Sequence, residues 1–318
     1  MVQAIPTYTT SCFMLPWSLC HEIKVLIHKF WWGQWGDRRK IHWVKWDDMC
    51  DLKVEGRMGF KELSFFNEAL LGKQTWRLLH NKNSLFYRVF KSRFFPNCTI
   101  MEAKEGHCGS YAWKSILKGR GVIQRGAKWR MGDGESIKIY GDNWLPIASL
   151  SSVHGPLPSK FQNASVSSLI KHQTHTWNLE VLSIALTPFE VDLVQKITLS
   201  HGQSRDVLFW PFMQSGIYSV KSGYYFLKFE VRTTTTQAQA LPDHPKPPWN
   251  RIWKLNLPNK IKKFLWRVAY NALPTSSELV RRYIINDPIY TLCSSHCEDV
   301  LHSLWPCSTL SQVWEEDP

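Results

Sequence analysis

The residues best suited to chemistry are cysteine and histidine side chains near the end of the chain. Cys293, Cys297, His302 and Cys307 are separated by three, four and four residues. Thiolate and imidazole groups at such spacings are the ligands of structural zinc, which takes four of them in a tetrahedron. The cluster therefore predicts a zinc site, and His296 is a further candidate ligand. The alternative is that these are free cysteines and unliganded histidines.

The eight cysteines as a whole do not suggest a disulfide framework, because they are spread along 318 residues. A reducing compartment is the simpler interpretation, so we expect the protein inside the cell, in the nucleus or cytoplasm. The apolar stretch 10–20 has no basic segment before it and is followed at once by His21, Glu22 and Lys24. It is therefore neither a signal peptide nor a membrane span, and we expect no membrane partner.

Charge is the second indication of function. The chain has 39 Lys and Arg against 26 Asp and Glu, which gives a net charge of +13. Such a surplus favours a polyanionic partner, and nucleic acid is the first candidate. The charge balance alone would also suit a membrane surface or an acidic protein.

The segment 259–269 combines apolar and basic residues at helical spacing. Four apolar residues share one face of the predicted helix, which we expect to be buried: Ile261, Phe264, Leu265 and Val268. The candidate nucleic-acid contacts are Lys260, Lys262, Lys263, Arg267 and Trp266. The cations could contact phosphates and the indole could stack on unpaired bases. A second basic run, Arg38-Arg39-Lys40, supports a weaker version of this argument, and the alternative is a solvated charged face.

No pattern of established catalytic chemistry is present. The sequence has no Gly-x-Ser-x-Gly elbow, no phosphate-binding loop and no His-Glu-x-x-His. Its only adjacent aspartates are Asp47 and Asp48, which we expect to form a solvated acidic turn. We therefore expect no enzyme activity and no small-molecule substrate.

Apolar periodicity predicts helices in the first third of the chain. One helix is expected over 64–80, from the stripe Leu63, Phe66, Leu70 and Leu71. A second is expected before the Trp31-Trp32 pair, from the stripe Ile23, Leu26, Ile27 and Phe30. Both stripes are expected to be core. Further on, 127–131 and 136–140 alternate around Gly132-Asp133-Gly134-Glu135, which predicts a β-hairpin.

A set of landmarks along the chain resembles a known family. They include Phe30-Trp31-Trp32-Gly33, Phe66-Asn67-Glu68-Ala69-Leu70-Leu71-Gly72-Lys73, Gly141-Asp142-Asn143-Trp144-Leu145-Pro146, Leu257-Pro258-Asn259-Lys260-Ile261-Lys262-Lys263-Phe264 and the cysteine cluster. Together they resemble plant non-LTR (LINE-type) retrotransposon reverse transcriptases, over the region after the palm and the C-terminal zinc-binding domain.

The resemblance implies a ligand set for the zinc. The family pattern is Cys-x2-Cys, followed by a histidine and, after four intervening residues, a last cysteine, so Cys293, His302 and Cys307 fall on its second, third and fourth positions. Tyr290 falls on the first, where a phenol cannot replace a thiolate. Cys297 or His296 would then have to complete the site.

The implied architecture is of the α+β class and has four parts. We expect a helical thumb-like region over 1–119, a mixed α/β connector with the hairpin over 120–232, a linker over 233–248, and a separable, small helical zinc-knuckle-like domain over 249–318. The linker assignment rests on a run of Thr, Gln and Pro without an apolar face.

The family's polymerase chemistry needs paired aspartates that hold two metal ions. In the family these aspartates lie at the tip of a hairpin in the palm. Asp47-Asp48 aligns instead with the region after the palm, so we expect a truncated product without the catalytic palm. Its expected activity is nonspecific RNA or DNA binding. One alternative is an inert relic of a decaying element. Another is part of an RNA-directed DNA polymerase whose catalytic half is missing from the gene model.

Overall fold

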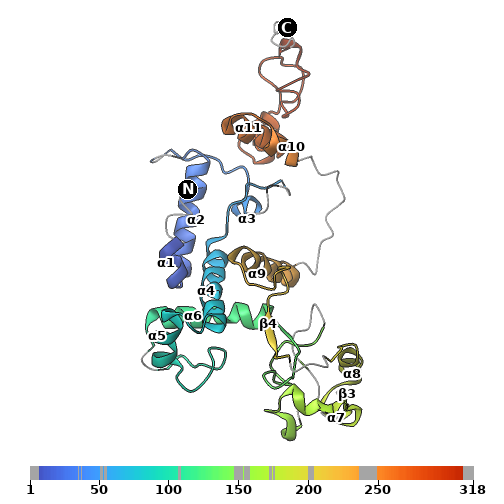
Figure 1. Ribbon diagram of the computed structural model, residues 1–318. Helices are drawn as coiled ribbons and strands as arrows, with labels where there is room; N and C mark the ends of the chain where they lie inside the picture. Colours follow the sequence, from blue (N-terminus) through green and yellow to red (C-terminus); the bar gives the residue numbers. More distant parts are fainter. Residues whose placement is uncertain are drawn as a thin grey trace. The chain divides into compact units, whose positions relative to one another are not determined.

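The computed structural model describes residues 7–34, 36, 38–50, 53, 56–106, 109–146, 153, 158–171, 174, 176–199, 204–235 and 249–310. These residues are mainly helical with a few short strands, which confirms the α+β class (Figure 1). The chain divides into two compact units. Unit 1 combines 1–20 with 63–239, and unit 2 combines 21–62 with 240–318. The four-part division expected from the sequence stays a prediction.

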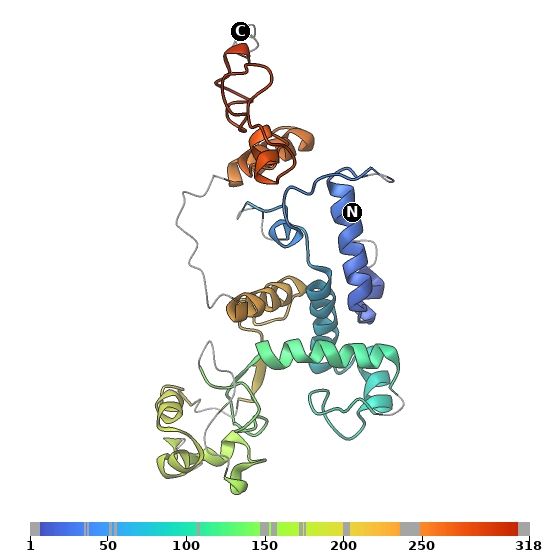
Figure 2. The ribbon, with the colours of Figure 1, turned by 180° about the vertical axis from the view of Figure 1, so that it is seen from behind.

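Crossing helices form the first half of unit 1. They are α1 (Thr7–Cys12), α4 (Leu63–His80), α5 (Leu85–Phe94), α6 (Tyr111–Gly126) and α9 (Val220–Thr235). Figures 1 and 2 show α4 crossing α6. The crossing is close because Gly119 has no side chain: a Cβ there would lie 2.3 Å from the carbonyl carbon of Leu71. The predicted helix over 64–80 is confirmed, and Leu63, Leu70 and Leu71 of its stripe are buried.

Two buried polar side chains in this half of unit 1 link distant segments through hydrogen bonds. The Asn67 amide donates to Thr10 O (2.6 Å) and Phe13 O (2.8 Å) and accepts from Leu15 N (2.8 Å), which attaches the N-terminal segment to α4. The hydroxyl of Tyr218 donates to Ala69 O over 2.9 Å. Such bonds matter because an unpaired buried polar group costs more than the bond itself contributes.

The second half of unit 1 packs short elements around its own apolar core, which includes Ile137, Val166 and Leu182. Its helices are η3 (Ser159–Phe161), η4 (Val166–Leu169), α7 (Leu179–Ala185) and α8 (Pro188–Gln195). Its strands are β1 (Lys128–Arg130), β2 (Ile170–Lys171), β3 (Thr176–Trp177) and β4 (Val207–Phe209). β1 pairs antiparallel with β4, and β2 pairs antiparallel with β3.

The hairpin expected between 127–131 and 136–140 is not formed. β1 takes β4 as its partner, with Lys128 opposite Phe209. The Gly-rich loop instead surrounds the carboxylate of Asp206, which accepts from the backbone N–H groups of Gly132 (2.7 Å), Gly134 (3.0 Å) and Ser136 (2.9 Å). Because one distant side chain satisfies all three amides, the loop does not need a neighbouring strand.

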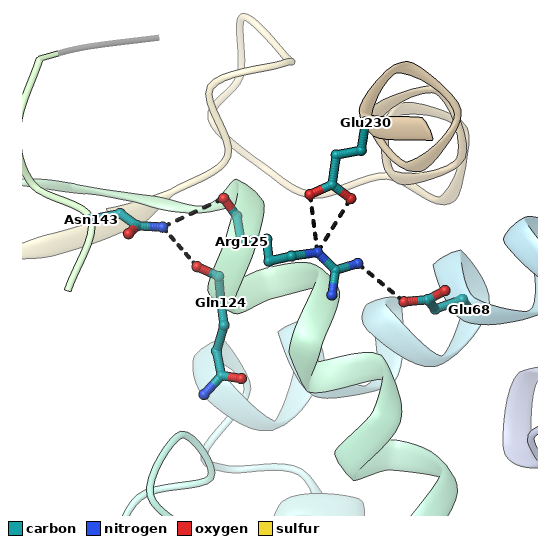
Figure 3. Close-up of polar contacts among 5 residues, drawn as sticks. All are labelled: Glu68, Gln124, Arg125, Asn143 and Glu230. Atoms are coloured by element: carbon teal, nitrogen blue, oxygen red, sulfur yellow. Dashed lines mark hydrogen bonds and ion pairs between the residues drawn. The ribbon is translucent and has the colours of Figure 1, made fainter. Parts of the chain in front are cut away.

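The C-terminal end of α6 is held by two polar side chains (Figure 3). The amide of Asn143 donates to Gln124 O (2.7 Å) and to Ala127 O (3.3 Å), carbonyls that the end of the helix leaves without an internal partner. On the other side, the Arg125 guanidinium lies between Glu68 (3.3 Å) and Glu230 (3.0 Å). Arg125 therefore ties α6 to α4 and to α9.

Unit 2 is built from two distant segments that share one aromatic core. Its helices are most of α2 (Trp17–Trp31), α3 (Trp46–Met49), α10 (Trp249–Lys254), α11 (Asn259–Ala269) and α12 (Ser276–Arg281). The core combines Trp32, Val44 and Met49 of the first segment with Trp249 and Trp266 of the second. A fragment of 249–318 alone would therefore lack half of its core.

The stripe expected to be core in α2 is only partly so. α2 is a helix, but Leu26 and Phe30 are 64% and 70% exposed. The inward side of α2 instead carries Ile23, Ile27 and His28, which are half-buried. The expectation was wrong because His28 is polar in sequence and yet packs inward, against the Val44 carbonyl.

The acidic pair begins the short helix α3. Asp47 is 3.4 Å from the Lys24 ammonium, and Asp48 is 2.7 Å from the Arg57 guanidinium.

No helix in the described part of the chain is long and apolar enough to cross a membrane.

Replacing Asn143 with alanine is expected to destabilise unit 1 by about 1–3 kcal/mol, because the last carbonyls of α6 would lose their donor. Urea unfolding of the full chain measures this. Gln124→Ala is the matched control, since only its backbone carbonyl takes part and its side chain is exposed. Equal losses from both variants would contradict the assignment.

Acid is expected to destabilise unit 2 through a histidine pair. The rings of His28 and His42 lie 4.2 Å apart, and burial lowers the pKa of both, with lesser effects from Lys24 on His28 and from Lys29 on His42. Below about pH 6.5 the unfolded chain therefore binds more protons than the folded one, and stability falls as the pH falls through the lowered pKa values.

Hydrogen exchange of the amides of 38–50, corrected for intrinsic rates, measures this at pH 7.5 and 5.5. A His28→Gln/His42→Gln variant should show a smaller change between the two pH values. An unchanged pH dependence in that variant would assign the effect to other groups.

Candidate metal centre

The loop after α12 folds back on itself and forms a tight turn. Tyr290 N donates to His296 O (2.8 Å), and Glu298 N donates to Pro288 O (2.7 Å). Within the turn, Ser294 N donates to Tyr290 O over 2.8 Å, and Ser294 has a φ of 53°. These bonds hold Cys293 at the tip of the turn.

Three potential metal ligands meet at this turn. The ligand atoms of Cys293, His302 and Cys307 all lie within 4.8 Å of one another, and Cys293 Sγ is 3.3 Å from His302 Nε2. Around a tetrahedral zinc, sulfur and nitrogen ligands would be about 3.6 Å apart and two sulfurs about 3.8 Å apart. The three residues therefore fit zinc in both chemistry and spacing.

Two acidic residues, Glu298 and Asp299, fix the backbone around these ligands through hydrogen bonds. Asp299 Oδ1 accepts from the backbone N–H of His302 over 2.6 Å, which fixes the start of the turn that carries this histidine. The Glu298 carboxylate accepts from the backbone N–H of Ser276 (3.0 Å) and from the Ser276 hydroxyl. Glu298 thus attaches the loop 283–310, called the metal loop below, to the beginning of α12.

The local hydrogen bonds favour a thiolate at Cys293. The backbone N–H of Ser295 has the largest effect, followed by the side chain of His302, and together with weaker donors they lower the pKa of Cys293 to about 6. At neutral pH this thiol is then largely ionised. The thiolate is the form that binds metal.

The other residues predicted for the site lie around this group of three. Cys297 is exposed and lies outside the group. The His296 ring is 5.2 Å from the His302 ring, centroid to centroid. Tyr290, in the family's first ligand position, sets its ring edge-on to His302 at 5.8 Å, and burial, then nearby Glu298, raises its pKa. The ligand role of each stays a prediction.

Trp266 does not have the nucleic-acid role expected from the sequence. It is fully buried, its indole Nε1 donates to Gly56 O over 2.7 Å, and its ring stacks on Tyr270 at 5.3 Å. A side chain in this position cannot stack on a base. The expectation was wrong because sequence spacing did not reveal that the segment 21–62 packs on this side of α11.

The buried face of α11 also differs from the expected one, which comprised Ile261, Phe264, Leu265 and Val268. Ile261 and Phe264 are each 43% exposed, whereas Trp266 occupies the core. The helix turns its Trp266 and Arg267 side toward the first segment, so part of the predicted apolar face looks outward.

The predicted cations of α11 differ in how far they are engaged. Lys260 and Lys263 are exposed, and the Lys263 ammonium also lies 4.8 Å from the centre of the Trp31 ring. Lys262 donates to Trp253 O over 3.3 Å. Arg267 donates to Ala272 O (3.1 Å), lies 5.6 Å from the Trp32 ring, and has its pKa lowered by burial.

Cation–π contacts join the two segments of unit 2, and sequence reasoning missed them. Besides the contacts of Lys263 and Arg267, they are Arg282 with Trp43 (4.8 Å), Lys53 with Trp253 (4.7 Å) and Arg57 with Tyr270 (5.6 Å). The available signal was composition, since the chain has 17 tryptophans and a surplus of cations. The pairing of particular cations with particular rings cannot be inferred from composition.

The positive charge of unit 2 lies outside the metal loop. Residues 283–310 contain no Lys or Arg but include Asp287, Glu298 and Asp299. The exposed cations of unit 2 include Lys260 and Lys263 on α11 and the run Arg38-Arg39-Lys40. A polyanion would therefore contact the helices and the first segment in preference to the metal loop.

Comparison with known proteins gives three matches. A family model described as zinc-binding in reverse transcriptase matches residues 218–314. A candidate ribonuclease H protein of Arabidopsis thaliana is 28% identical over an alignment of 334 residues, which covers 99% of this chain and 50% of that protein. An uncharacterised mitochondrial protein of the same plant is 41% identical over 144 residues, 45% of this chain and 94% of that protein. The chain thus spans about half the length of the first relative.

Trp266→Phe separates a core role from a binding role. Loss of the indole N–H leaves Gly56 O unpaired, so we expect a destabilisation of about 1–3 kcal/mol in urea unfolding. Affinity for nucleic acid should be unchanged where the variant is folded. The control Trp305→Phe, at a 73% exposed position, should shift stability by less than about 0.5 kcal/mol. A folded Trp266→Phe variant that lost affinity would restore the stacking role.

Proposed function

Because this chain belongs to the retroelement-derived proteins with a reverse transcriptase zinc-binding domain, we propose that it binds RNA or DNA without reading sequence. Unit 2 is the binding unit. In this proposal zinc is a structural ion held by Cys293, His302 and Cys307, and it cross-links the loop when bound.

The observation that carries the proposal is the separation of charge within unit 2. Exposed cations lie on α11 and at 38–40, and the metal loop has none. Cations of this kind bind phosphates and release counterions, which gives affinity without base recognition. Arg267 and Lys262 have a different part: through their carbonyl and ring contacts they hold the surface that displays Lys260 and Lys263.

Polymerisation is not part of the proposed activity. Asp47 and Asp48, the adjacent aspartates, are engaged with Lys24 and Arg57 at the start of α3. We propose a reducing location, the nucleus or cytoplasm, where the free cysteines at 293 and 307 would stay available to metal.

Tyr290 favours one competing function, that of an inert relic. It stands where the family has a metal ligand, so a copy under no constraint could carry it. The two functions predict different nucleic-acid affinities. The proposed function requires binding that weakens with salt, whereas an inert relic does not require any binding.

Salt titration tests the proposal. We expect the full chain to bind fluorescently labelled RNA and DNA of unrelated sequence with similar affinity, falling steeply between about 50 and 200 mM salt. An Arg38→Gln/Arg39→Gln/Lys260→Gln variant should weaken binding of every sequence. Its slope of log affinity against log salt should be smaller by up to about 2.7, at 0.9 per lost phosphate contact.

The control removes the same charge from unit 1, with Lys104→Gln/Lys118→Gln/Lys171→Gln, three exposed lysines. It should change the slope much less. Binding that ignores salt would refute the proposal, and equal losses from both triple variants would remove the assignment to unit 2.

A further inference from the structure

The three converging ligands leave one position of a tetrahedron to be supplied by the loop itself. Within 290–307, five further residues carry a phenol, imidazole, thiol or carboxylate: Tyr290, His296, Cys297, Glu298 and Asp299. The last two are committed elsewhere, since their carboxylates accept from the backbone N–H groups of Ser276 and His302. The choice is therefore among Tyr290, His296 and Cys297.

Proximity to the metal group favours His296 over Cys297. The ring of His296 lies beside the ring of the ligand His302. Cys297 is exposed, its backbone pairs with Ile289, and it lies outside the group of three.

The two imidazole rings are close enough to share one zinc once the His296 side chain is turned toward it. With Zn–N bonds of about 2.0–2.1 Å, two imidazoles on one tetrahedral zinc would have ring centroids about 5.2 Å apart. The observed separation between His296 and His302 is 5.2 Å.

We propose that His296 supplies the fourth zinc ligand and replaces the one lost at Tyr290. This inference rests on the zinc binding proposed above. The ring nitrogens of His296 lie outside the 4.8 Å group, so the proposed ligand role requires this exposed side chain to rotate toward the ion. The resulting set of two thiolates and two neutral imidazoles balances the charge of Zn²⁺. Tyr290 stays against His302 as a packing residue.

Metal titration of the full chain tests this. Zinc affinity is measured by competition with a chelator, and coordination by the visible spectrum of the protein loaded with Co²⁺ alone. His296→Ala should lower zinc affinity by more than the about 10–100-fold that loss of an outer-shell partner costs, and should remove the tetrahedral Co²⁺ spectrum. Cys297→Ser, the adjacent control, should change neither.

A rescue variant keeps the test independent of folding. Tyr290→Cys/His296→Ala restores a thiolate at the family's first position, so it should regain tight zinc and a tetrahedral Co²⁺ spectrum with one more sulfur. If the wild type binds zinc and Cys297→Ser, not His296→Ala, abolishes it, His296 is not the ligand although zinc binding stands. If the wild type binds no zinc and Tyr290→Cys does, both the zinc site and the role of His296 fail.

Discussion

Unit 2 depends on a seam of cations and aromatic rings between two segments far apart in sequence. Lys263, Arg267 and Arg282 of the second segment lie over Trp31, Trp32 and Trp43 of the first, and Lys53 and Arg57 lie over rings of the second. Each contact is worth about 0.5–2 kcal/mol, more where it is desolvated. Because the seam crosses in both directions, neither segment can be removed without exposing rings of the other.

Because of this seam, the net positive charge of the chain is not a direct measure of its capacity to bind phosphates. Part of the cation surplus is used internally, where a ring face partly replaces the water lost from a guanidinium, as at Arg267. Other cations are displayed to solvent, among them Lys260 and the run 38–40, which lie close in sequence to the tryptophans of the seam. Folding and phosphate binding therefore draw on the same residue type, and a substitution must be assigned to one or the other by its neighbours.

Sequence reasoning succeeded where information is local. The periodicity of 63–80 predicted α4, and the spacing of Cys293, His302 and Cys307 predicted residues that do converge. It failed where the partner is distant. Gly132 and Gly134 bind a carboxylate about seventy residues away, at Asp206, and Trp266 is buried by Gly56 and its neighbours. A short window contains no information on such partners, so turn chemistry and helix faces were assigned to the wrong neighbours.

The discontinuity of unit 2 sets an order on its formation during synthesis. Trp31, Trp32 and Trp43 leave the ribosome first, and their partners Lys263, Arg267 and Arg282 follow only after all of 63–239. At about 5–20 residues per second, some two hundred residues take about 10–40 s. During that interval unit 1 can fold, while the first segment carries a row of unsatisfied indoles. The first segment therefore depends on chaperones until α11 emerges.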